Sequence, residues 1–378
     1  MKRRVSVEVD LAALKRNYAK IAARVKPARV LSVLKANAYG LGVVEYAKAL
    51  YDAGCRQFGV AEPHEALELR KILKFTRNDA EVQILSSILP DEILPMVKLG
   101  VILPVTDLAS AKLISKAAQK LDKTAKVHIK IDTGMGRLGI PVIDAFNTIL
   151  EILRLPNLDC EGIFSHCAMA YDPKDPTTLR QINLFKALIA ELKREGVVFR
   201  EIHIAASDAI NNFPEAIKRP FNVVRTGINL HGSFDPNGRK ALKLEPVLTL
   251  KTRVAQVREL PAGTTLGYGR TWCLNEPTKI ATISAGYADG FPLAISNRGF
   301  VFIGGKRCKI LGRISMDYTT VDVTDVPKVK SGDEVICFGK CGDDSITPDD
   351  WAEIKGTHAY DIICSLGSRV ERVVVERS

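Results

Sequence analysis

The chain has 378 residues, 46% hydrophobic and 26% charged, a composition typical of a globular protein long enough for two domains. Its formal net charge is +11, but basic and acidic residues are interspersed and no nucleic-acid-binding motif is present, so we expect no nucleic-acid partner. No run of eighteen apolar residues exists, which argues against a membrane partner, and eight dispersed cysteines without a secretion signal favour a cytoplasmic location.

Short β-rich segments alternate with helical segments from residue 29 to about residue 230. The expected strands are 29–35, 58–61, 82–87, 101–106, 125–132, 158–166, 201–206 and 222–226. The clearest helices are 63–73, 107–121 and 177–196. In the last of these the period of 3.6 residues predicts one apolar face, made of Leu184, Phe185, Leu188 and Leu192. Eight strands that alternate with helices predict an α/β fold, the (β/α)₈ TIM-type barrel.

The pattern changes after Gly232 to strand-like segments separated by Gly, Pro and Asp turns, which predicts a C-terminal mostly-β domain. Its expected strands are 246–258, 278–286, 300–303, 307–311, 319–324 and 333–338. The turn-rich stretch 233–240 predicts the linker, so we divide the chain into a barrel domain (1–235) and a β domain (236–378). A strand at 4–9, within residues 1–10, precedes the barrel and could pair with the second domain.

Polar residues follow several predicted barrel strands at the end where such barrels carry their active sites. Lys35, His166 and Arg225 stand at or near three strand ends, and Ser207 and Gly227 follow the seventh and eighth strands. Loops in those last two positions commonly bind phosphate, and glycine lets backbone N–H groups approach closely. A strand-end lysine, a phosphate cradle and an arginine suit pyridoxal 5′-phosphate, held as a Schiff base on Lys35. No cysteine spacing of a zinc site occurs, so no metal is expected.

Several motifs that extend over nearly the whole chain resemble those of the alanine racemase family, and two of them, around Lys35 and at Gly-Tyr287-Ala-Asp-Gly, are highly specific. They read Val-Leu-Lys35-Ala-Asn-Ala-Tyr39-Gly, Lys130-Ile-Asp-Thr-Gly-Met-Gly-Arg137, Phe-Ser-His166, Val-Val-Arg225-Thr-Gly-Ile, Gly-Tyr268-Gly, Gly-Tyr287-Ala-Asp-Gly, Gly-Arg-Ile-Ser-Met316-Asp and Ala-Tyr360-Asp. The resemblance implies a pyridoxal-phosphate-dependent amino-acid racemase that interconverts L-alanine and D-alanine and supplies D-alanine for peptidoglycan.

The resemblance also implies a homodimer whose active site is shared across the interface, with Tyr268 and Met316 supplied by the partner subunit. Lys35 and Tyr268 would be the catalytic bases on opposite faces of the substrate's α-carbon, because racemisation requires proton removal on one face and return on the other. Arg225 would meet the pyridine nitrogen and His166 the ring face. The residues implied for the phosphate are Tyr39, Ser207, Gly227, Ile228 and Tyr360. Those implied for the substrate are Arg137, Met316 and Tyr287.

Lys130 belongs to a polar face of its predicted strand, because His128, Lys130 and Asp132 alternate with Val127, Ile129 and Ile131. If this face points into the barrel, Lys130 is buried near Arg137 and the two cations repel. Carbamylation, a modification of some family members, would convert Lys130 into an anion that pairs with Arg137. The alternative is an uncharged or solvated lysine.

The sequence departs from the family pattern at several positions beside the site, none of which removes a catalytic group. Ala206 replaces an asparagine, Thr226 a proline, His231 a tyrosine, Ser315 a cysteine, and His358-Ala359 the usual Ile-Asn. These changes bear on cofactor affinity and on the preference for alanine. Alternatives on the same scaffold are a racemase for serine or for a broad range of amino acids, a decarboxylase of basic amino acids, and a non-catalytic pyridoxal phosphate carrier. The second domain and Tyr268 disfavour the last two.

Overall fold

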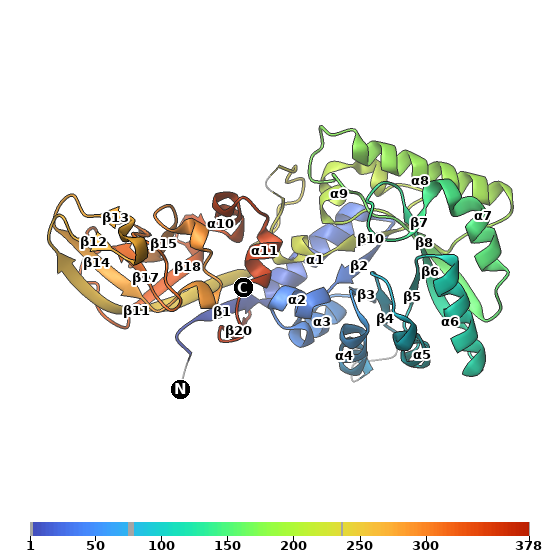
Figure 1. Cartoon of the computed structure of the whole chain (residues 1–378), viewed down its shortest axis with the longest axis horizontal. Coiled ribbons are helices and arrows are strands. Elements are labelled where there is room, and N and C mark those ends of the chain that lie inside the picture. The colour runs from blue at the N-terminus through green and yellow to red at the C-terminus, as the bar shows by residue number, and fades with distance from the viewer. Residues whose placement is uncertain (1–2, 75–78, 236, 378) are drawn as a thin grey trace.

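A computed structural model describes residues 3–74, 79–235 and 237–377 of the chain. Figure 1 shows two bodies side by side, a barrel of strands surrounded by helices and an elongated domain built mainly from strands. The domain boundary that we predict at 235/236 falls next to residue 236, which lies outside the described residues. The boundary therefore stays a prediction.

Eight parallel strands form the first body and confirm the predicted barrel. They are β2 (Arg29–Val33), β3 (Gln57–Val60), β4 (Glu81–Ile84), β5 (Leu103–Val105), β6 (Ala125–Asp132), β8 (Leu158–Phe164), β9 (Glu201–His203) and β10 (Val223–Thr226). Two sheets, ordered β10-β2-β3-β4 and β5-β6-β8-β9, are joined at one seam by a bridge between Gln83 and Ile102. At the other seam the Arg225 N–H donates to the Ala205 carbonyl at 3.0 Å, which closes the ring.

Helices cover the outside of the barrel (Figure 1). They are α1 (Leu11–Val25), α3 (Val43–Asp52), α4 (Pro63–Lys74), α5 (Pro90–Leu99), α6 (Leu108–Lys120), α7 (Val142–Leu153), α8 (Thr177–Arg194) and the short α9 (Ser207–Asn212). The three predicted helices are present as α4, α6 and α8. On α8, Phe185, Leu188 and Leu192 are buried as predicted, but Leu184 is 36% exposed. Leu184 lies about 100° around the helix from Phe185, so it points away from the face that packs on the barrel.

The second body contains a nine-stranded sheet that also includes the chain's first strand. Its strands are β1 (Ser6–Asp10), β11 (Leu248–Leu260), β14 (Thr278–Ile283), β15 (Phe300–Ile303), β16 (Lys306–Lys309), β17 (Thr319–Asp322), β18 (Glu334–Cys341), β19 (Asp344–Ile346) and β20 (Glu371–Val375). β1 pairs antiparallel with β11 and parallel with β20. From β1 in the β domain the chain therefore crosses into the barrel through α1 and later returns.

Three further elements of the second body matter for the site. A two-stranded hairpin, β12 (Thr265–Leu266) with β13 (Trp272–Cys273), lies at the end of this body remote from the barrel, whereas α11 (Ala359–Cys364) lies beside the barrel (Figure 1). The helix α10 (Pro348–Lys355) precedes α11. α11 and the hairpin therefore lie at opposite ends of the second domain. Contacts with the barrel are made at the α11 end, where the Arg372 side chain of β20 also donates to the Gly40 carbonyl at 2.9 Å.

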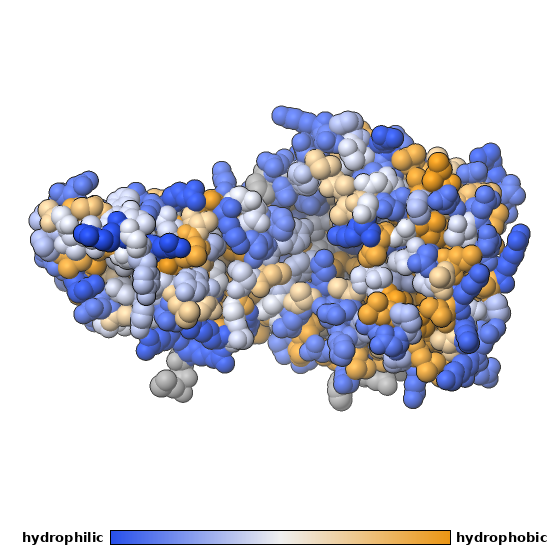
Figure 2. All heavy atoms as spheres, viewed as in Figure 1, coloured by the Kyte–Doolittle hydropathy of each residue, from blue (hydrophilic) through white to orange (hydrophobic). Residues whose placement is uncertain are grey.

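The surface is mixed in character, with more apolar side chains over the barrel than over the second domain on the face shown in Figure 2. Among the described residues, no helix has the length and apolar character needed to cross a membrane.

Candidate active site

Lys35 opens a short irregular segment, α2 (Lys35–Gly40), rather than ending a strand. We predicted a strand to residue 35, but β2 ends at Val33. From Ala36 to Tyr39 the backbone is left-handed, with φ between 52° and 60°, a conformation that costs L-residues roughly 1–2 kcal/mol each. The Glu65 carboxylate accepts the Ala36 N–H, and the Asn37 side chain accepts the Val43 N–H at 2.8 Å. These bonds hold the strained turn that presents Lys35 and Tyr39.

Four cations act on His166 at this mouth of the barrel, two of them from β6 and the loop after it. Burial, and then the positive charges of Arg225, Arg137, Lys130 and Lys35, lower the pKa of His166 to about 3, so its ring is neutral. Desolvation followed by Arg137 lowers the pKa of Lys35. An amine in this field loses its proton more readily than a free lysine, as a nucleophile or base requires. The same field attracts anionic ligands.

Lys130 lies on the inward face of β6, with a side chain that is 6% exposed. Its ammonium donates to the Leu85 carbonyl at 3.2 Å. Burial, followed by Arg225 and Arg137, lowers the pKa of Lys130 to about 8. The buried, repelled lysine that strand alternation predicts is therefore present. Its carbamylation stays a prediction.

Arg225 is 4% exposed, and hydrogen bonds to several neighbouring groups hold its guanidinium in place. One guanidinium nitrogen donates to His203 Nδ1 at 2.7 Å, and the other donates to the carbonyls of Ser165 at 2.7 Å and Ile204 at 2.9 Å. The second nitrogen also lies 3.2 Å from His166 Nδ1. Burial lowers the pKa of Arg225 to about 10, which leaves it positively charged at neutral pH. Arg225 is thus a fixed cation with its rotamer determined by the barrel.

Hydroxyl groups gather beside the loop after β10. Ser207 Oγ accepts the Gly227 N–H at 3.1 Å, and a Cβ at position 227 would lie 2.0 Å from the Tyr39 hydroxyl. The Tyr360 ring, carried by α11, lies 5.9 Å from the Tyr39 ring. Within the described part of the chain, the buried Thr226 hydroxyl has no hydrogen-bond partner. Ile228 follows at the start of a buried 3₁₀ turn, Ile228–His231. A closely approaching backbone and an unsatisfied hydroxyl suit a phosphate group.

Three of the site residues implied by the resemblance lie elsewhere in the protomer. Tyr268 is 72% exposed, Met316 52% and Tyr287 44%. Tyr287 and Met316 are neighbours, because the Tyr287 N–H donates to the Ser315 carbonyl and the Ala288 N–H to the Met316 carbonyl. Tyr268 lies between β12 and β13, remote from the barrel mouth in the same protomer (Figure 1). A single chain therefore does not bring Tyr268 to Lys35.

Sequence reasoning did not select the two buried histidines beneath Arg225. His203 ends β9 and contacts Arg225, and His128 lies in β6 beneath it. His128 shares the inward face of its strand with Lys130, so the alternation that drew attention to Lys130 could also have identified it. His231 was noted only as a departure. Its Nδ1 shares a hydrogen bond of 2.8 Å with the Tyr46 hydroxyl, and its ring packs edge-on against Tyr39.

Comparisons with known proteins agree with this architecture. The family models "Alanine racemase, N-terminal domain" and "Alanine racemase, C-terminal domain" match residues 9–235 and 247–374. The chain belongs to the alanine racemase family. This confirms the resemblance that the motifs indicate. The alanine racemase of Carboxydothermus hydrogenoformans is 37% identical over 99% of this chain and 100% of its own length. That of Desulfosudis oleivorans is 38% identical over 97% of this chain and 95% of its own.

Solved structures of this family superpose closely on the chain. An alanine racemase from D-cycloserine-producing Streptomyces lavendulae has a TM-score of 0.91 at 31% identity, covering 100% of this chain and 98% of that one. The alanine racemase of Bartonella henselae, described with covalently bound pyridoxal phosphate, has a TM-score of 0.87 at 31% identity, covering 99% of this chain and 100% of that one. The family relationship thus includes both domains.

Proposed function

We propose that this chain is an alanine racemase that interconverts L-alanine and D-alanine with pyridoxal 5′-phosphate held covalently by Lys35. The main support is that Lys35, Arg225 and the hydroxyl groups beside the loop after β10 lie together at one mouth of the barrel, in a chain of the alanine racemase family. A bound pyridoxal ring would delocalise the electron pair left when the substrate's α-carbon loses a proton. The protein's task is then to orient the substrate and to move that proton.

The residues present fit this cofactor. The unpartnered Thr226 hydroxyl, the Gly227 backbone that only a residue without Cβ permits, and the nearby Tyr39, Ser207 and Tyr360 would hold the phosphate, with Ile228 adding its backbone. Arg225 would face the pyridine nitrogen. Because a guanidinium donates hydrogen bonds but does not yield its proton at neutral pH, that nitrogen would stay unprotonated. His166, neutral beside Arg225, would pack against the ring.

We assign the two proton-transferring groups to Lys35 Nζ and the Tyr268 hydroxyl of the partner subunit. The lowered pKa of Lys35 favours an uncharged amine that can accept a proton from D-alanine. Tyr268 would accept the proton from L-alanine on the other face. Its 72% exposure in the single protomer, on a hairpin remote from its own barrel, supports a role in a second subunit's site. The proposal therefore requires a homodimer.

The substrate carboxylate would be bound by Arg137, which lies among the cations around His166, and by the Met316 backbone and Tyr287 across the interface. Lys130, carbamylated, would pair with Arg137. We infer that the enzyme works in the cytoplasm and supplies D-alanine for peptidoglycan.

Purified protein with added pyridoxal phosphate tests the proposal through the rates of D-alanine formation from L-alanine and of D-serine formation from L-serine. We expect a higher kcat/KM for alanine. Comparable values would indicate a serine or broad-specificity racemase, which one hydroxyl of difference makes hard to discriminate by packing alone. Cofactor bound without racemisation of either amino acid would indicate a carrier and contradict the proposal.

A further inference from the structure

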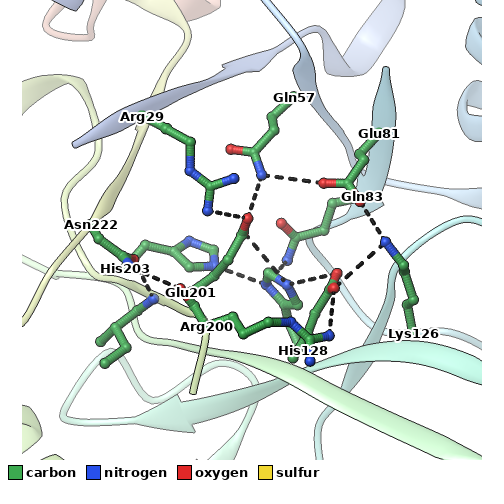
Figure 3. Close-up of polar contacts among 12 residues, drawn as sticks. Arg29, Gln57, Glu81, Gln83, Lys126, His128, Arg200, Glu201, His203 and Asn222 are labelled. Atoms are coloured by element: carbon green, nitrogen blue, oxygen red, sulfur yellow. Dashed lines mark hydrogen bonds and ion pairs between the residues drawn. The ribbon is translucent and has the colours of Figure 1, made fainter. Parts of the chain in front are cut away.

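A continuous column of polar side chains extends from Arg225 through the barrel axis to the amino-terminal ends of the strands. His203 Nε2 lies 3.0 Å from His128 Nδ1, and His128 Nε2 faces Glu161 Oε1 at 3.6 Å and Glu201 Oε2 at 3.7 Å. Figure 3 shows Arg29, Gln57, Glu81, Lys126 and Arg200 around this lower end. The column and the cofactor site thus share Arg225.

The donors and acceptors along the column can be ordered in only one direction, with each histidine donating away from Arg225. Arginine only donates, so His203 Nδ1 must be an acceptor. Burial, followed by the charge of Arg225, holds the pKa of His203 well below its usual value, so its single proton lies on Nε2. That proton is donated to His128 Nδ1. The proton of His128 then lies on Nε2, toward the two carboxylates.

The two carboxylates at the lower end can accept but not donate, so they require the same direction. Both side chains are about 95% buried. Burial opposes ionisation of Glu161, but the adjacent His128 ring, the hydrogen bond from Arg200 and the charge of Lys126 outweigh it and hold its pKa at about 2. Within the described chain, His128 Nε2, Glu161 Oε1 and Glu201 Oε2 have no hydrogen-bond partner. The nearest complementary groups are these atoms themselves, at 3.6 and 3.7 Å from His128 Nε2. Gln83 also donates to His128 Nδ1 at 3.0 Å, but an amide can turn to serve either tautomer.

Packing fixes the position of the central histidine as well. A Cβ at Gly162 would lie 2.5 Å from three atoms of the His128 ring. The His203 ring stacks on Phe164 with centroids 5.0 Å apart and planes 8° from parallel. Neither ring has room to rotate away from its hydrogen-bond partners.

We propose that Glu161 and Glu201, at the end of the barrel opposite Lys35, are positioning residues that hold His128 and His203 in the tautomers that anchor Arg225. The proposal rests on the proposed contact of Arg225 with the cofactor's pyridine nitrogen. If His128 carried its proton on Nδ1, two N–H groups would oppose each other at the junction with His203. Relief would require His203 to turn a proton toward Arg225 and so release the guanidinium.

Glu→Gln substitutions would place a hydrogen-bond donor, instead of an acceptor, opposite His128 Nε2 without changing the side-chain volume. Glu201 Oε1 already accepts from Arg29 at 2.6 Å and Gln57 at 2.5 Å, so a glutamine oxygen would remain there and its NH₂ would face His128. Glu161 Oε2 accepts from Arg200 at 3.0 Å, with the same consequence. Glu81→Gln is the matched control. Glu81 accepts from Lys126 and Gln57 in the same cluster, but within the described chain it makes no hydrogen bond or ion pair with His128.

The first measurement is ¹⁵N NMR of histidine-labelled, cofactor-free protein, whose six histidines report their tautomers directly. We expect Nε2–H for His128 and His203 in wild type and in Glu81→Gln, and loss of that pattern in the double variant Glu161→Gln/Glu201→Gln. Either single variant serves if the double variant fails to fold. A doubly protonated His128, or unchanged tautomers in the folded glutamine variants, would overturn the proposal even if the protein proved not to be a racemase.

The second measurement is the visible absorbance of pyridoxal phosphate bound to Lys35, together with kcat and KM for L-alanine. We expect the glutamine variants to bind the cofactor with a displaced absorbance maximum and to lose about tenfold in kcat with little change in KM, as loss of an orienting partner typically does. Glu81→Gln should match wild type in both. Equal spectra and kcat for Glu81→Gln and the double variant would reject the positioning role. A wild type that binds cofactor but does not racemise would instead reject the proposed function.

Discussion

The Tyr39 hydroxyl lies directly against the backbone of Gly227, closely enough that a Cβ at position 227 would be 2.0 Å from it. This contact joins the left-handed turn after β2 to the loop after β10, two segments that are adjacent around the barrel and remote in sequence. The Gly227 backbone has a φ of −129°, so the requirement for glycine here is steric rather than conformational.

We expect Gly227→Ala to displace Tyr39 and to weaken pyridoxal phosphate binding by at least about tenfold, since a contact of 2.0 Å cannot be absorbed without a shift. Titration of cofactor-free protein followed by absorbance measures this. Gly227→Ala/Tyr39→Phe removes the clashing oxygen and should recover part of the Tm that Gly227→Ala loses. Unchanged cofactor affinity in Gly227→Ala would show that this contact does not shape the phosphate site.

The left-handed turn predicts an unusual response to glycine. Ala36 has a φ of 53° and ψ of 47°, so Ala36→Gly should stabilise the protein by up to about 1 kcal/mol because glycine adopts this region without a Cβ penalty. The control is Ala19→Gly, an exposed position within α1, which should destabilise by about 1 kcal/mol. Thermal unfolding of both variants should give Tm shifts of opposite sign. Equal losses of Tm would mean that the turn is not left-handed at residue 36.

The proposed sharing of the active site between two subunits predicts complementation between two inactive variants. Tyr268→Phe should retain the absorbance of cofactor bound to Lys35 but stop α-proton exchange of L-alanine, while Lys35→Ala should lose that absorbance. Tyr318→Phe, another exposed tyrosine of the second domain, is the control and should exchange normally. Mixing the two inactive proteins under conditions that exchange subunits should restore activity, because a mixed dimer contains one site with both groups. Lack of restored activity in verified mixed dimers would contradict a site shared between subunits.

Lys130 predicts a pH dependence of stability. Its pKa is about 8 in the folded protein and about 10.4 when unfolded, so between these values the unfolded chain binds the additional proton and stability rises with pH. Without carbon dioxide, the stability of wild type relative to Lys130→Met should therefore increase from about pH 8 to about pH 10, by up to about 3 kcal/mol. Denaturant unfolding across this range measures the difference.

Carbamylation would abolish that slope, because the carbamate is an anion beside Arg225 and Arg137. The intact mass should then exceed the sequence mass by one carbon dioxide and return to it in Lys130→Met. A flat pH profile without the mass increase would contradict both states of Lys130 and would place its amine in solvent.

Most of the barrel was predictable because its strands and helices are local patterns. The eight strands appear as predicted, and the errors concern only where strands begin and end. At Val33, for example, the chain leaves the sheet for a left-handed turn that hydrophobic periodicity does not predict. The burial of Lys130 also followed from alternation along one strand. By contrast, Leu184 was misplaced because apolar character alone does not define the edge of a helical face.

The sequence by itself determined the family, the barrel and the residue types available for chemistry, because motif spacing and hydrophobic period are properties of neighbouring residues. Only the tertiary structure decided which groups meet. It brings Tyr360 of the last helix to Tyr39, leaves Tyr268 remote from its own Lys35, and stacks His203 and His128 beneath Arg225. Those relationships depend on barrel closure and on burial. Burial lowers the pKa of Lys35, Lys130 and His166 through desolvation, and cations contributed by distant strands lower it further.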